Sequence, residues 1–396
     1  MRITMLAHSY PPAMGGGETL VYLLTKYLQR KNIEVSVVTD SKYRCIEKEV
    51  LGKNIKYVFL EDFEKYSKGE ITDKYFLNKA ILGVKQTSPD IVHSFNLYPG
   101  YLASMFGRTF GTPIVFTFFN TPLSNGSLIR MFENPNIERA FVRGMVSGMK
   151  FDHLISYSKY VHSSAIELLN VPKSKCSWHY PGVDYEVFNS SFRDEEIRNN
   201  YKVTKDEIFI VVPARVVPRK KIETLVNAAH LIKDLNFKIL ISSGGIKQEG
   251  FEWYYDKIKD MIEVCELTEK VILPTQRYNF EELGRLYASA DVAILSSEAE
   301  GLGLSILEAI QSSCAIIASR TSGINEIIKH QYNGLLFTVG DHKTLASLIK
   351  EYIYNPALRS FLTKNANISL ENKFNLNKYI DHHINIYNGI LCKSQK

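Results

Sequence analysis

The sequence has few cysteines, and they follow no recognisable pattern. The chain of 396 residues contains 5, namely Cys45, Cys176, Cys265, Cys314 and Cys392. Their number is odd, and no two of them have the spacing of paired metal ligands. We therefore expect neither a disulfide framework nor a zinc site.

An apolar run long enough to cross a bilayer is also missing. The first apolar run, at residues 2–7, is short and is soon followed by Pro11, Pro12 and three glycines, which is typical of a first strand and not of a signal peptide. We expect a cytoplasmic protein. The net charge of +6 suits an anionic ligand or an anionic membrane surface, although an ordinary solvated surface explains it equally well.

Apolar runs of strand length alternate with amphipathic stretches along the chain, which predicts the doubly wound α/β class. A polar stretch at residues 189–200 interrupts the alternation, so we expect two domains of nearly equal size, 1–187 and 188–374. Helical spacing over about 375–396 predicts a last helix. The expected strands are 3–7, 35–39, 57–60, 91–94, 114–118 and 154–156 in the first half, and 208–212, 238–242, 271–273, 292–295, 315–318 and 335–337 in the second.

Two glutamates, eight positions apart, flank a glycine-rich turn after one of these strands. Gly301 and Gly303 allow close approach of the backbone to a ligand, and a helix is expected to begin near Leu304, where free amides attract anions. Glu308 lies one turn inside that helix, so its carboxylate can accept hydrogen bonds from ligand hydroxyls, whereas Glu300 faces the other end of the ligand. The glutamates could instead only cap the helix start, but the two glycines would then have no role.

A basic segment follows the first expected strand of the second half. It reads Arg-Val-Val-Pro-Arg-Lys-Lys over residues 215–221. Basic runs are most often solvated faces, and we expect that of Arg219 and Lys221. Together with the glutamates, Arg215 and Lys220 are expected to bind an anion.

With these residues the chain resembles the retaining glycosyltransferases of the GT-B fold. The resemblance is to the large family 4-like group 1, which contains sucrose synthases, bacterial mannosyltransferases and lipopolysaccharide glucosyltransferases. The resemblance covers nearly the whole chain and implies two Rossmann-like domains that face each other across a central cleft. It also implies that the last helix, at about 375–396, returns to the first domain. It rests on six elements in order: Gly15-Gly16-Gly17-Glu18, Pro181-Gly182-Val183-Asp184, Arg215 with Lys220, residues 283–291, residues 300–308, and Gly323-Ile324-Asn325-Glu326 with Asn333-Gly334-Leu335-Leu336.

The resemblance also implies roles for individual residues in the binding of a nucleoside diphosphate sugar, which we expect to be a UDP-sugar. Arg215 and Lys220 would neutralise the departing diphosphate. Glu308 would accept the ribose hydroxyls, and Glu300 would hold hydroxyls of the transferred sugar. Further donor contacts are expected at Gly16, Gly17, Gly244, Gly303, Leu304 and Ser305.

The sequence contains no Asp-x-Asp, the motif by which metal-dependent transferases hold a cation. Two fixed cations and the amides of a helix start can stabilise a departing diphosphate without a metal. We expect no metal and no cofactor beyond the donor itself. The Gly15–Gly17 loop could also belong to a nicotinamide dinucleotide site, but Leu20 stands in place of the third glycine of that fingerprint.

One position departs from the family. In relatives, the strand that here covers residues 113–118 continues into a histidine beside the donor sugar, but this chain has Phe119 followed by Asn120. Phenylalanine cannot bond a sugar's 6-hydroxyl, so either the donor lacks that contact, as a 6-deoxy or N-acetylated sugar could, or Asn120, His93 or His8 supplies it. His93 ends an expected strand, and a satisfied buried histidine is an equally good interpretation of it.

Residues 134–150 predict a basic amphipathic helix, in which Arg139, Arg143 and Lys150 alternate with apolar residues. Such a helix can lie on anionic lipid, here the inner face of the plasma membrane, or pack on a sheet.

Taken together, these features predict a hexosyltransferase or N-acetylhexosaminyltransferase that moves a sugar to a hydroxyl of a glycan, a lipid-linked acceptor or a small molecule, with no nucleic acid partner. The resemblance implies front-face substitution, in which the leaving phosphate accepts the acceptor's proton. One alternative is a catalytically silent GT-B protein that binds a nucleotide sugar or a partner enzyme, with Phe119 as its sign. Another is a nucleotide-sugar epimerase, for which we find no set of acid and base residues.

Overall fold

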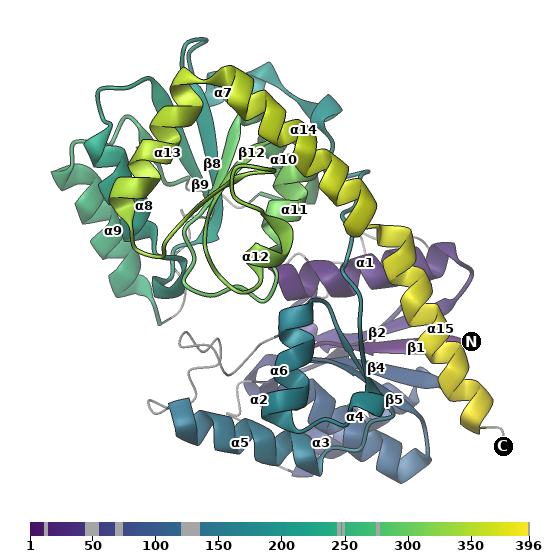
Figure 1. Cartoon of the computed structure of the whole chain (residues 1–396). Coiled ribbons are helices and arrows are strands. Elements are labelled where there is room, and N and C mark those ends of the chain that lie inside the picture. The colour runs from purple at the N-terminus through teal and green to yellow at the C-terminus, as the bar shows by residue number, and fades with distance from the viewer. Residues whose placement is uncertain are drawn as a thin grey trace. The chain divides into compact units, whose positions relative to one another are not determined.

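The computed structural model describes residues 1–11, 15–43, 55–67, 74–119, 135–243, 247, 250–274 and 278–394. The chain forms two compact units (Figure 1). The first consists of Met1–Pro181 and Leu376–Lys396, and the second of Gly182–Asn375. The division thus falls after Pro181, compared with the expected one between residues 187 and 188.

The first unit is built on a 7-stranded sheet with the order β3-β2-β1-β4-β5-β6-β7. All neighbouring strands in it are parallel. The strands are β1 (Arg2–Leu6), β2 (Glu34–Asp40), β3 (Lys56–Leu60), β4 (Ile91–Phe95), β5 (Ile114–Thr117), β6 (His153–Ser156) and β7 (Cys176–Trp178).

Helices follow the strands of this sheet. Side chains of α2 to α6 share one core cluster with the strands, whereas α1 and α15 contact each other outside that cluster. The last helix of the chain therefore belongs to the first unit. The helices are α1 (Gly16–Arg30), α2 (Phe63–Ser67), α3 (Lys74–Lys85), α4 (Leu97–Phe110), α5 (Pro135–Gly148), α6 (Lys159–Leu169) and α15 (Leu376–Ser394).

The second unit contains a 6-stranded parallel sheet with the order β10-β9-β8-β11-β12-β13. Its strands are β8 (Ile208–Arg215), β9 (Phe237–Ser243), β10 (Val271–Ile272), β11 (Val292–Leu295), β12 (Ala315–Ser319) and β13 (Leu335–Phe337). Its helices are α7 (Glu195–Asn200), α8 (Ile222–Leu231), α9 (Glu252–Val264), α10 (Phe280–Ser289), α11 (Leu304–Gln311), α12 (Ile324–Ile327), α13 (His342–Tyr354) and α14 (Pro356–Lys373).

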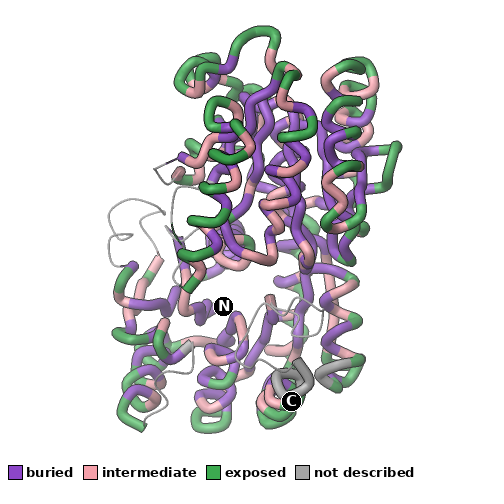
Figure 2. The backbone as a smooth tube through the Cα atoms, turned by 90° about the vertical axis from the view of Figure 1, so that its left-hand side faces the viewer, coloured by how far each residue is buried: buried purple, intermediate pink, exposed green. Residues whose placement is uncertain are grey.

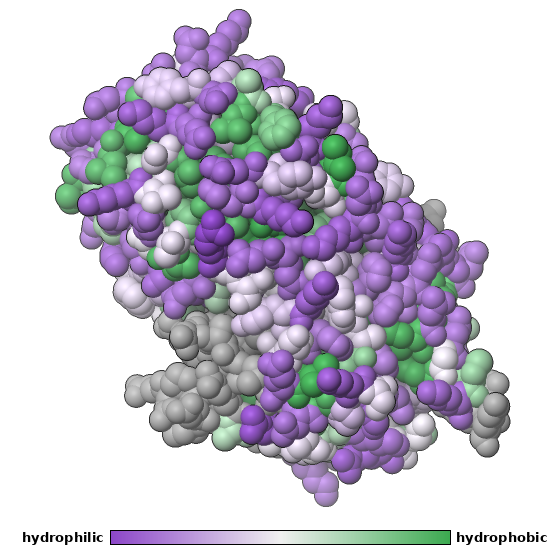
Figure 3. Space-filling view, in the orientation of Figure 1, coloured by the Kyte–Doolittle hydropathy of each residue, from purple (hydrophilic) through white to green (hydrophobic). Residues whose placement is uncertain are grey.

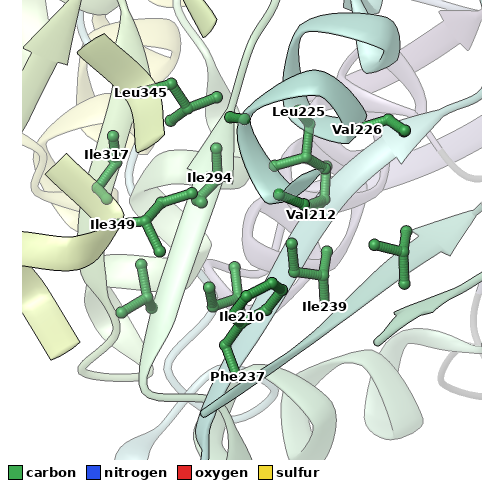
Figure 4. Close-up of a cluster of buried hydrophobic side chains, with 14 of the residues drawn as sticks. Ile210, Val212, Leu225, Val226, Phe237, Ile239, Ile294, Ile317, Leu345 and Ile349 are labelled. Atoms are coloured by element: carbon green, nitrogen blue, oxygen red, sulfur yellow. The ribbon is translucent and has the colours of Figure 1, made fainter. Parts of the chain in front are cut away.

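The core of the second unit lies between its strands and helices α8, α9 and α13. Ile210 on β8, Ile294 on β11 and Ile317 on β12 point toward Leu225 on α8 and Leu345 on α13 (Figure 4). Strands β11 and β12 are buried along their whole length, which explains why they read as continuous apolar runs. Figure 2 shows buried residues in the interior and exposed ones mainly on the outer segments. The predicted doubly wound α/β class is confirmed for both units.

The surface of the described residues offers no large apolar face in the view of Figure 3, where hydrophobic side chains lie in scattered groups among hydrophilic ones. Helix α5 turns Val142 and Val146 into the core of the first unit and leaves Arg143 exposed, and Lys150, which follows the helix, is exposed as well. Within the described part of the chain, no helix combines the length and the apolar character that a membrane span requires.

Candidate active site

The site residues of the second unit follow the carboxyl ends of adjacent parallel strands. Strand β8 ends at Arg215 and leads into the short 3-10 helix η4 (Pro218–Lys220). Its neighbour β11 ends at Leu295 and leads through residues 296–303 into α11. Because parallel strands present their carboxyl ends at one edge of the sheet, the basic segment and the two glutamates meet at that edge.

Two glycines shape the turn that carries Glu300. Gly303 caps α11 with φ +96, a left-handed conformation that few other residues adopt. A Cβ atom on Gly323 would lie 2.5 Å from the carbonyl oxygen of Glu300 and 2.6 Å from the amide nitrogen of Leu302. The backbone of the turn therefore lies directly against the start of α12, and any side chain at position 323 would push it away.

Lys220 and Glu300 form an ion pair at this edge. The Nζ of Lys220 lies 2.5 Å from Oε1 of Glu300, and the two side chains are only 10% and 13% exposed. The backbones around them are joined as well: the hydroxyl of Ser296 donates to the carbonyl of Lys220 (2.7 Å), and the amide of Glu298 donates to the carbonyl of Arg219 (2.8 Å). Helix η4 and the turn thus hold the cation and the carboxylate together.

Burial and charge act in opposite directions on this pair. Burial alone would raise the pKa of Glu300, but the charges of Lys220 and Arg219 outweigh it and hold that pKa below its usual value. Burial also lowers the pKa of the Lys220 ammonium, which the Glu300 carboxylate opposes. A carboxyl with a depressed pKa is ionised at neutral pH, so Glu300 is present as a carboxylate beside Lys220.

Glu308 lies inside α11 and is 8% exposed. Burial raises the pKa of its carboxyl to about 7. Its carboxyl forms no hydrogen bond or ion pair with the residues that the structure describes, so its capacity to accept hydrogen bonds is open to a ligand. Ligand hydroxyls that donate to it would favour the ionised form.

The other predicted donor residues of this unit lie around the same edge. Arg215 is exposed, and Leu304 and Ser305 at the start of α11 are half-buried. The predicted contact at Gly244 comes directly after β9, but it lies outside the described residues.

In the first unit, the structure brings Phe119 and Gly17 together. A Cβ atom on Gly17 would meet the Phe119 ring at 2.7 Å. The ring stacks on Phe95 with centroids 5.6 Å apart, and the hydroxyl of Tyr157 donates to the Phe119 carbonyl at 2.7 Å. Phe119 is half-buried, Gly16 is the first residue of α1, and the predicted contact at Asn120 lies outside the described residues.

His93 is fully buried on β4 and is satisfied by protein partners. Its Nδ1 lies 2.6 Å from the hydroxyl of Tyr387 on α15, and its Nε2 lies 2.8 Å from the hydroxyl of Thr117 on β5. Burial, with a smaller contribution from His383, lowers the pKa of the imidazole, which is therefore neutral. Of the two interpretations of His93, the geometry supports the buried structural histidine over a contact with acceptor or sugar.

No cluster of three or more His, Cys, Asp or Glu side chains suited to a metal ion occurs among the described residues. The absence of a metal from the reaction remains a prediction from the sequence.

Comparison with protein families places each half of the chain. Residues 193–368 match the model for glycosyl transferases group 1, and residues 14–187 match the model for glycosyltransferase family 4. The chain belongs to the group 1 glycosyltransferases. The predicted resemblance is thereby confirmed, while the donor and acceptor of this glycosyltransferase are matters for proposal.

Among similar proteins is an uncharacterized glycosyltransferase of Methanocaldococcus jannaschii, 23% identical over 98% of each chain. A D-inositol 3-phosphate glycosyltransferase of an Arthrobacter species is 25% identical over 87% of this chain and 83% of its own length. Both are similar along most of their length.

Two solved structures share the fold of this glycosyltransferase. Sucrose-phosphate synthase from Thermosynechococcus elongatus superposes with a TM-score of 0.83 at 18% identity, covering 99% of each chain. Anabaena HepE in complex with UDP and glucose gives a TM-score of 0.80 at 17% identity, covering 98% of this chain and all of the other. At these identities the likeness establishes the GT-B fold alone.

Sequence reasoning missed one feature of the basic segment in this group 1 glycosyltransferase. Lys221 adopts φ +48, in the left-handed region, and its ammonium lies 3.2 Å from the carboxylate of Glu298. The spacing of charges along the chain does not reveal this pair, because the contact depends on the hydrogen bonds between η4 and the turn.

Proposed function

We propose that this glycosyltransferase moves a sugar from a nucleoside diphosphate sugar, with a UDP-sugar as the first candidate, to a hydroxyl group with retention of anomeric configuration and without a metal. The observation that carries this proposal is the buried ion pair of Lys220 and Glu300 at the sheet edge where α11 carries the buried carboxyl of Glu308, which has no partner among the described residues. Buried charges at a sheet edge are costly to fold, so a ligand-binding role accounts for them better than stability does.

Departure of the nucleoside diphosphate builds negative charge at its terminal phosphate. Arg215 at the end of β8 and Lys220 in η4 supply cations for that charge, and the amides at the start of α11 supply further donors. Lys220 is held in place by the hydroxyl of Ser296 at its own carbonyl, so little reorganisation is needed when the charge develops.

The two glutamates divide the remaining polar contacts. Glu308 accepts hydrogen bonds from the ribose hydroxyls of the nucleotide, which fits a carboxyl that bonds none of the residues described by the structure. Glu300 accepts from hydroxyls of the transferred sugar while it stays paired with Lys220. The sugar and the leaving phosphate are thereby held by neighbouring groups.

In the reaction, the bond between the anomeric carbon and the diphosphate oxygen breaks, and its electron pair stays on the diphosphate. The acceptor hydroxyl forms the new bond on the same face, and its proton passes to the departing phosphate. No protein nucleophile is needed, which is consistent with retention by front-face substitution.

Relatives support the choice of donor. Anabaena HepE, which shares the fold, has been solved with UDP and with UDP-glucose. Hexose and N-acetylhexosamine donors both remain in the proposal. The similar Arthrobacter enzyme is a D-inositol 3-phosphate glycosyltransferase. The candidate acceptors in this proposal therefore include a small molecule as well as glycans and lipid-linked acceptors.

Peripheral contact with an anionic membrane is the corresponding proposal for location. It rests on α5, where Arg143 and the following Lys150 are exposed. Flotation with vesicles that contain anionic lipid tests it, because neutral vesicles should not retain the protein.

The decisive experiment is to follow nucleotide release from UDP-, GDP- and ADP-sugars with and without candidate acceptors, and to determine the anomeric configuration of the product by NMR. We expect acceptor-dependent release from one class of donor and retention. Nucleotide binding without release from any donor would favour the catalytically silent alternative, and an inverted product would refute the mechanism.

A further inference from the structure

The charges of the basic segment are not equivalent in the structure. Lys220 is paired with Glu300, and Lys221 is paired with Glu298 at 3.2 Å. The guanidinium of Arg219, in contrast, forms no hydrogen bond or ion pair with any residue that the structure describes. Arg219 was expected to belong to a solvated face, as was Lys221, but only Lys221 has its charge matched by a carboxylate.

The backbone of Arg219 is fixed at the centre of the site. Its carbonyl accepts a hydrogen bond from the amide of Glu298 at 2.8 Å, and the next residue is Lys220. Helix η4 and the turn that carries Glu300 are joined at this point. The side chain of Arg219 is half-buried, so it lies at the boundary between the site and solvent.

The charge of Arg219 acts on both members of the ion pair. Burial raises the pKa of Glu300. The charge of Lys220 opposes this effect most strongly, and the charge of Arg219 lowers the pKa further. It also adds to the effect of burial in lowering the pKa of Lys220. The guanidinium of Arg219 therefore lies within electrostatic range of the pair.

An anion that enters this site meets a lysine whose charge is already matched by Glu300. We propose that Arg219 is an anion-binding residue of the donor site and contacts an anionic group of the donor beside Lys220. This proposal rests on the proposed function. A guanidinium is suited to the contact because its planar fork donates two parallel hydrogen bonds to a phosphate or a carboxylate.

The anionic group has two sources, the terminal phosphate of the nucleoside diphosphate and a carboxylate on an acidic transferred sugar. They make different predictions for ligands that lack the sugar. If Arg219 contacts the phosphate, its loss lowers the affinity for the bare nucleoside diphosphate and for its sugars equally. If a sugar carboxylate is bound, the bare diphosphate is unaffected and only the acidic sugar nucleotide binds more weakly.

The test measures binding by calorimetry to the full chain and to the Arg219→Gln, Arg219→Lys and Lys221→Gln variants. The ligands are UDP, GDP and ADP for the phosphate, and UDP-glucose with UDP-glucuronate for the carboxylate. Arg219→Gln should lower the affinity for the ligands that carry the bound anionic group by about tenfold, since a hydrogen bond between charged groups is lost. Arg219→Lys should recover part of this affinity. Lys221→Gln is the matched control, because it removes a charge from the same segment that is already paired, and it should change affinity by less than about threefold.

The outcomes separate this proposal from the proposed function. If the wild type binds nucleotides and Arg219→Gln binds every ligand equally well, the role of Arg219 is refuted while the function stands. An equal loss in Lys221→Gln would also refute it, because the effect would then be one of general charge. A wild type that binds none of the nucleotides would overturn the proposed function and, with it, this inference. Thermal melting of each variant confirms that it is folded.

Discussion

Each unit of this glycosyltransferase buries a cluster of polar side chains, and the two clusters differ in kind. In the second unit, Lys220 and Glu300 form an ion pair, and Glu308 has no hydrogen-bond or ion-pair partner in the described part of the chain. In the first unit, His93 bonds the hydroxyls of Tyr387 and Thr117, and all three groups are neutral. Burial of polar groups alone therefore does not identify a site.

The cluster of the first unit joins α15 to the sheet. His383 on α15 is buried 5.8 Å from the His93 ring, and its Nδ1 lies 2.8 Å from the carbonyl of Tyr379. Burial, opposed by that hydrogen bond and aided by His382, His179 and His153, lowers the pKa of His383 to about 3. These histidines stabilise the fold only in their neutral form, which assigns them to packing.

The comparison teaches that a site is recognised by what its groups lack. His93, which is neutral and hydrogen-bonded through both ring nitrogens, requires nothing further, whereas a buried ion pair is costly to desolvate and a buried carboxyl without a partner costs folding energy. Such groups are retained where a ligand completes their interactions. The predictions below ask whether individual residues belong to the first kind or to the second.

The largest effect is expected for the charged pair. Lys220→Ala should lower turnover by about a hundredfold or more, because it removes a charge that stabilises the departing diphosphate. It should also destabilise the fold, since Glu300 is left buried and unpaired. The double variant Lys220→Ala/Glu300→Ala should recover stability in thermal melts but not turnover. Arg215, which is exposed, provides a second test. Normal turnover in both Lys220→Ala and Arg215→Ala would show that the diphosphate does not bind at these two residues.

Phe119 could belong either to the packing of the first unit or to the donor site, because it packs on Gly17 and yet is half-buried. If its ring faces the donor sugar, it disfavours a 6-hydroxyl, and Phe119→His should shift preference toward the ordinary hexose by about ten- to a hundredfold, from the roughly 1 to 3 kcal/mol cost of an unpaired hydroxyl. The measurement is the ratio of kcat/KM for a UDP-hexosamine and its 6-deoxy counterpart. An unchanged ratio would assign Phe119 to packing, like His93.

Acid should affect the first cluster selectively. A histidine whose folded pKa is depressed contributes stability above its unfolded value of about 6.5, and this is lost as the pH falls toward the folded value. For His383 alone, with a pKa of about 3, opening of α15 should become about 25-fold more favourable between pH 7 and pH 5. Hydrogen exchange of α15, corrected for intrinsic rates, measures this, with α14 as the control. His383→Gln should reduce the difference but not abolish it, because burial also lowers the pKa of His382 on the same helix, to about 4, and that of His93, which bonds Tyr387 of α15. An equal response of both helices would contradict local release.

Much of this organisation was predictable from the sequence, because apolar runs in parallel sheets are long and continuous. The expected strands at 292–295 and 335–337 coincide with β11 and β13, and the turn before α11 was expected from its glycines. Strand β7 was missed because its residues are only half-buried and form no apolar run. The pairing of Lys220 with Glu300 was also missed, because charge spacing along a chain does not show which charges meet across two loops.

A smaller effect separates the two glutamates. Glu308→Ala should lower the affinity for the bare nucleoside diphosphate by about tenfold, since the ribose hydroxyls lose their acceptor. Glu300→Ala should spare that affinity and reduce transfer, because Glu300 is expected to contact the sugar. Titration calorimetry with the diphosphate and steady-state rates with the donor give both quantities for each variant. Equal losses of nucleotide affinity would mean that the carboxylates do not have separate roles.

The smallest expected effect is that of a chelator, which should leave turnover unchanged. The charge that a metal would neutralise is matched in this proposal by Arg215, Lys220 and the amides at the start of α11, all of which belong to the chain. The measurement compares initial rates in excess EDTA with rates after dialysis and addition of magnesium or manganese. The Lys220→Ala variant sharpens the comparison: if the cations of the chain act in place of a metal, added magnesium should not rescue it, because no carboxylate cluster of the described residues would hold the ion near the diphosphate. A loss of wild-type activity in EDTA that magnesium restores would show instead that the diphosphate brings a metal with it and that the basic segment is only part of the neutralising charge.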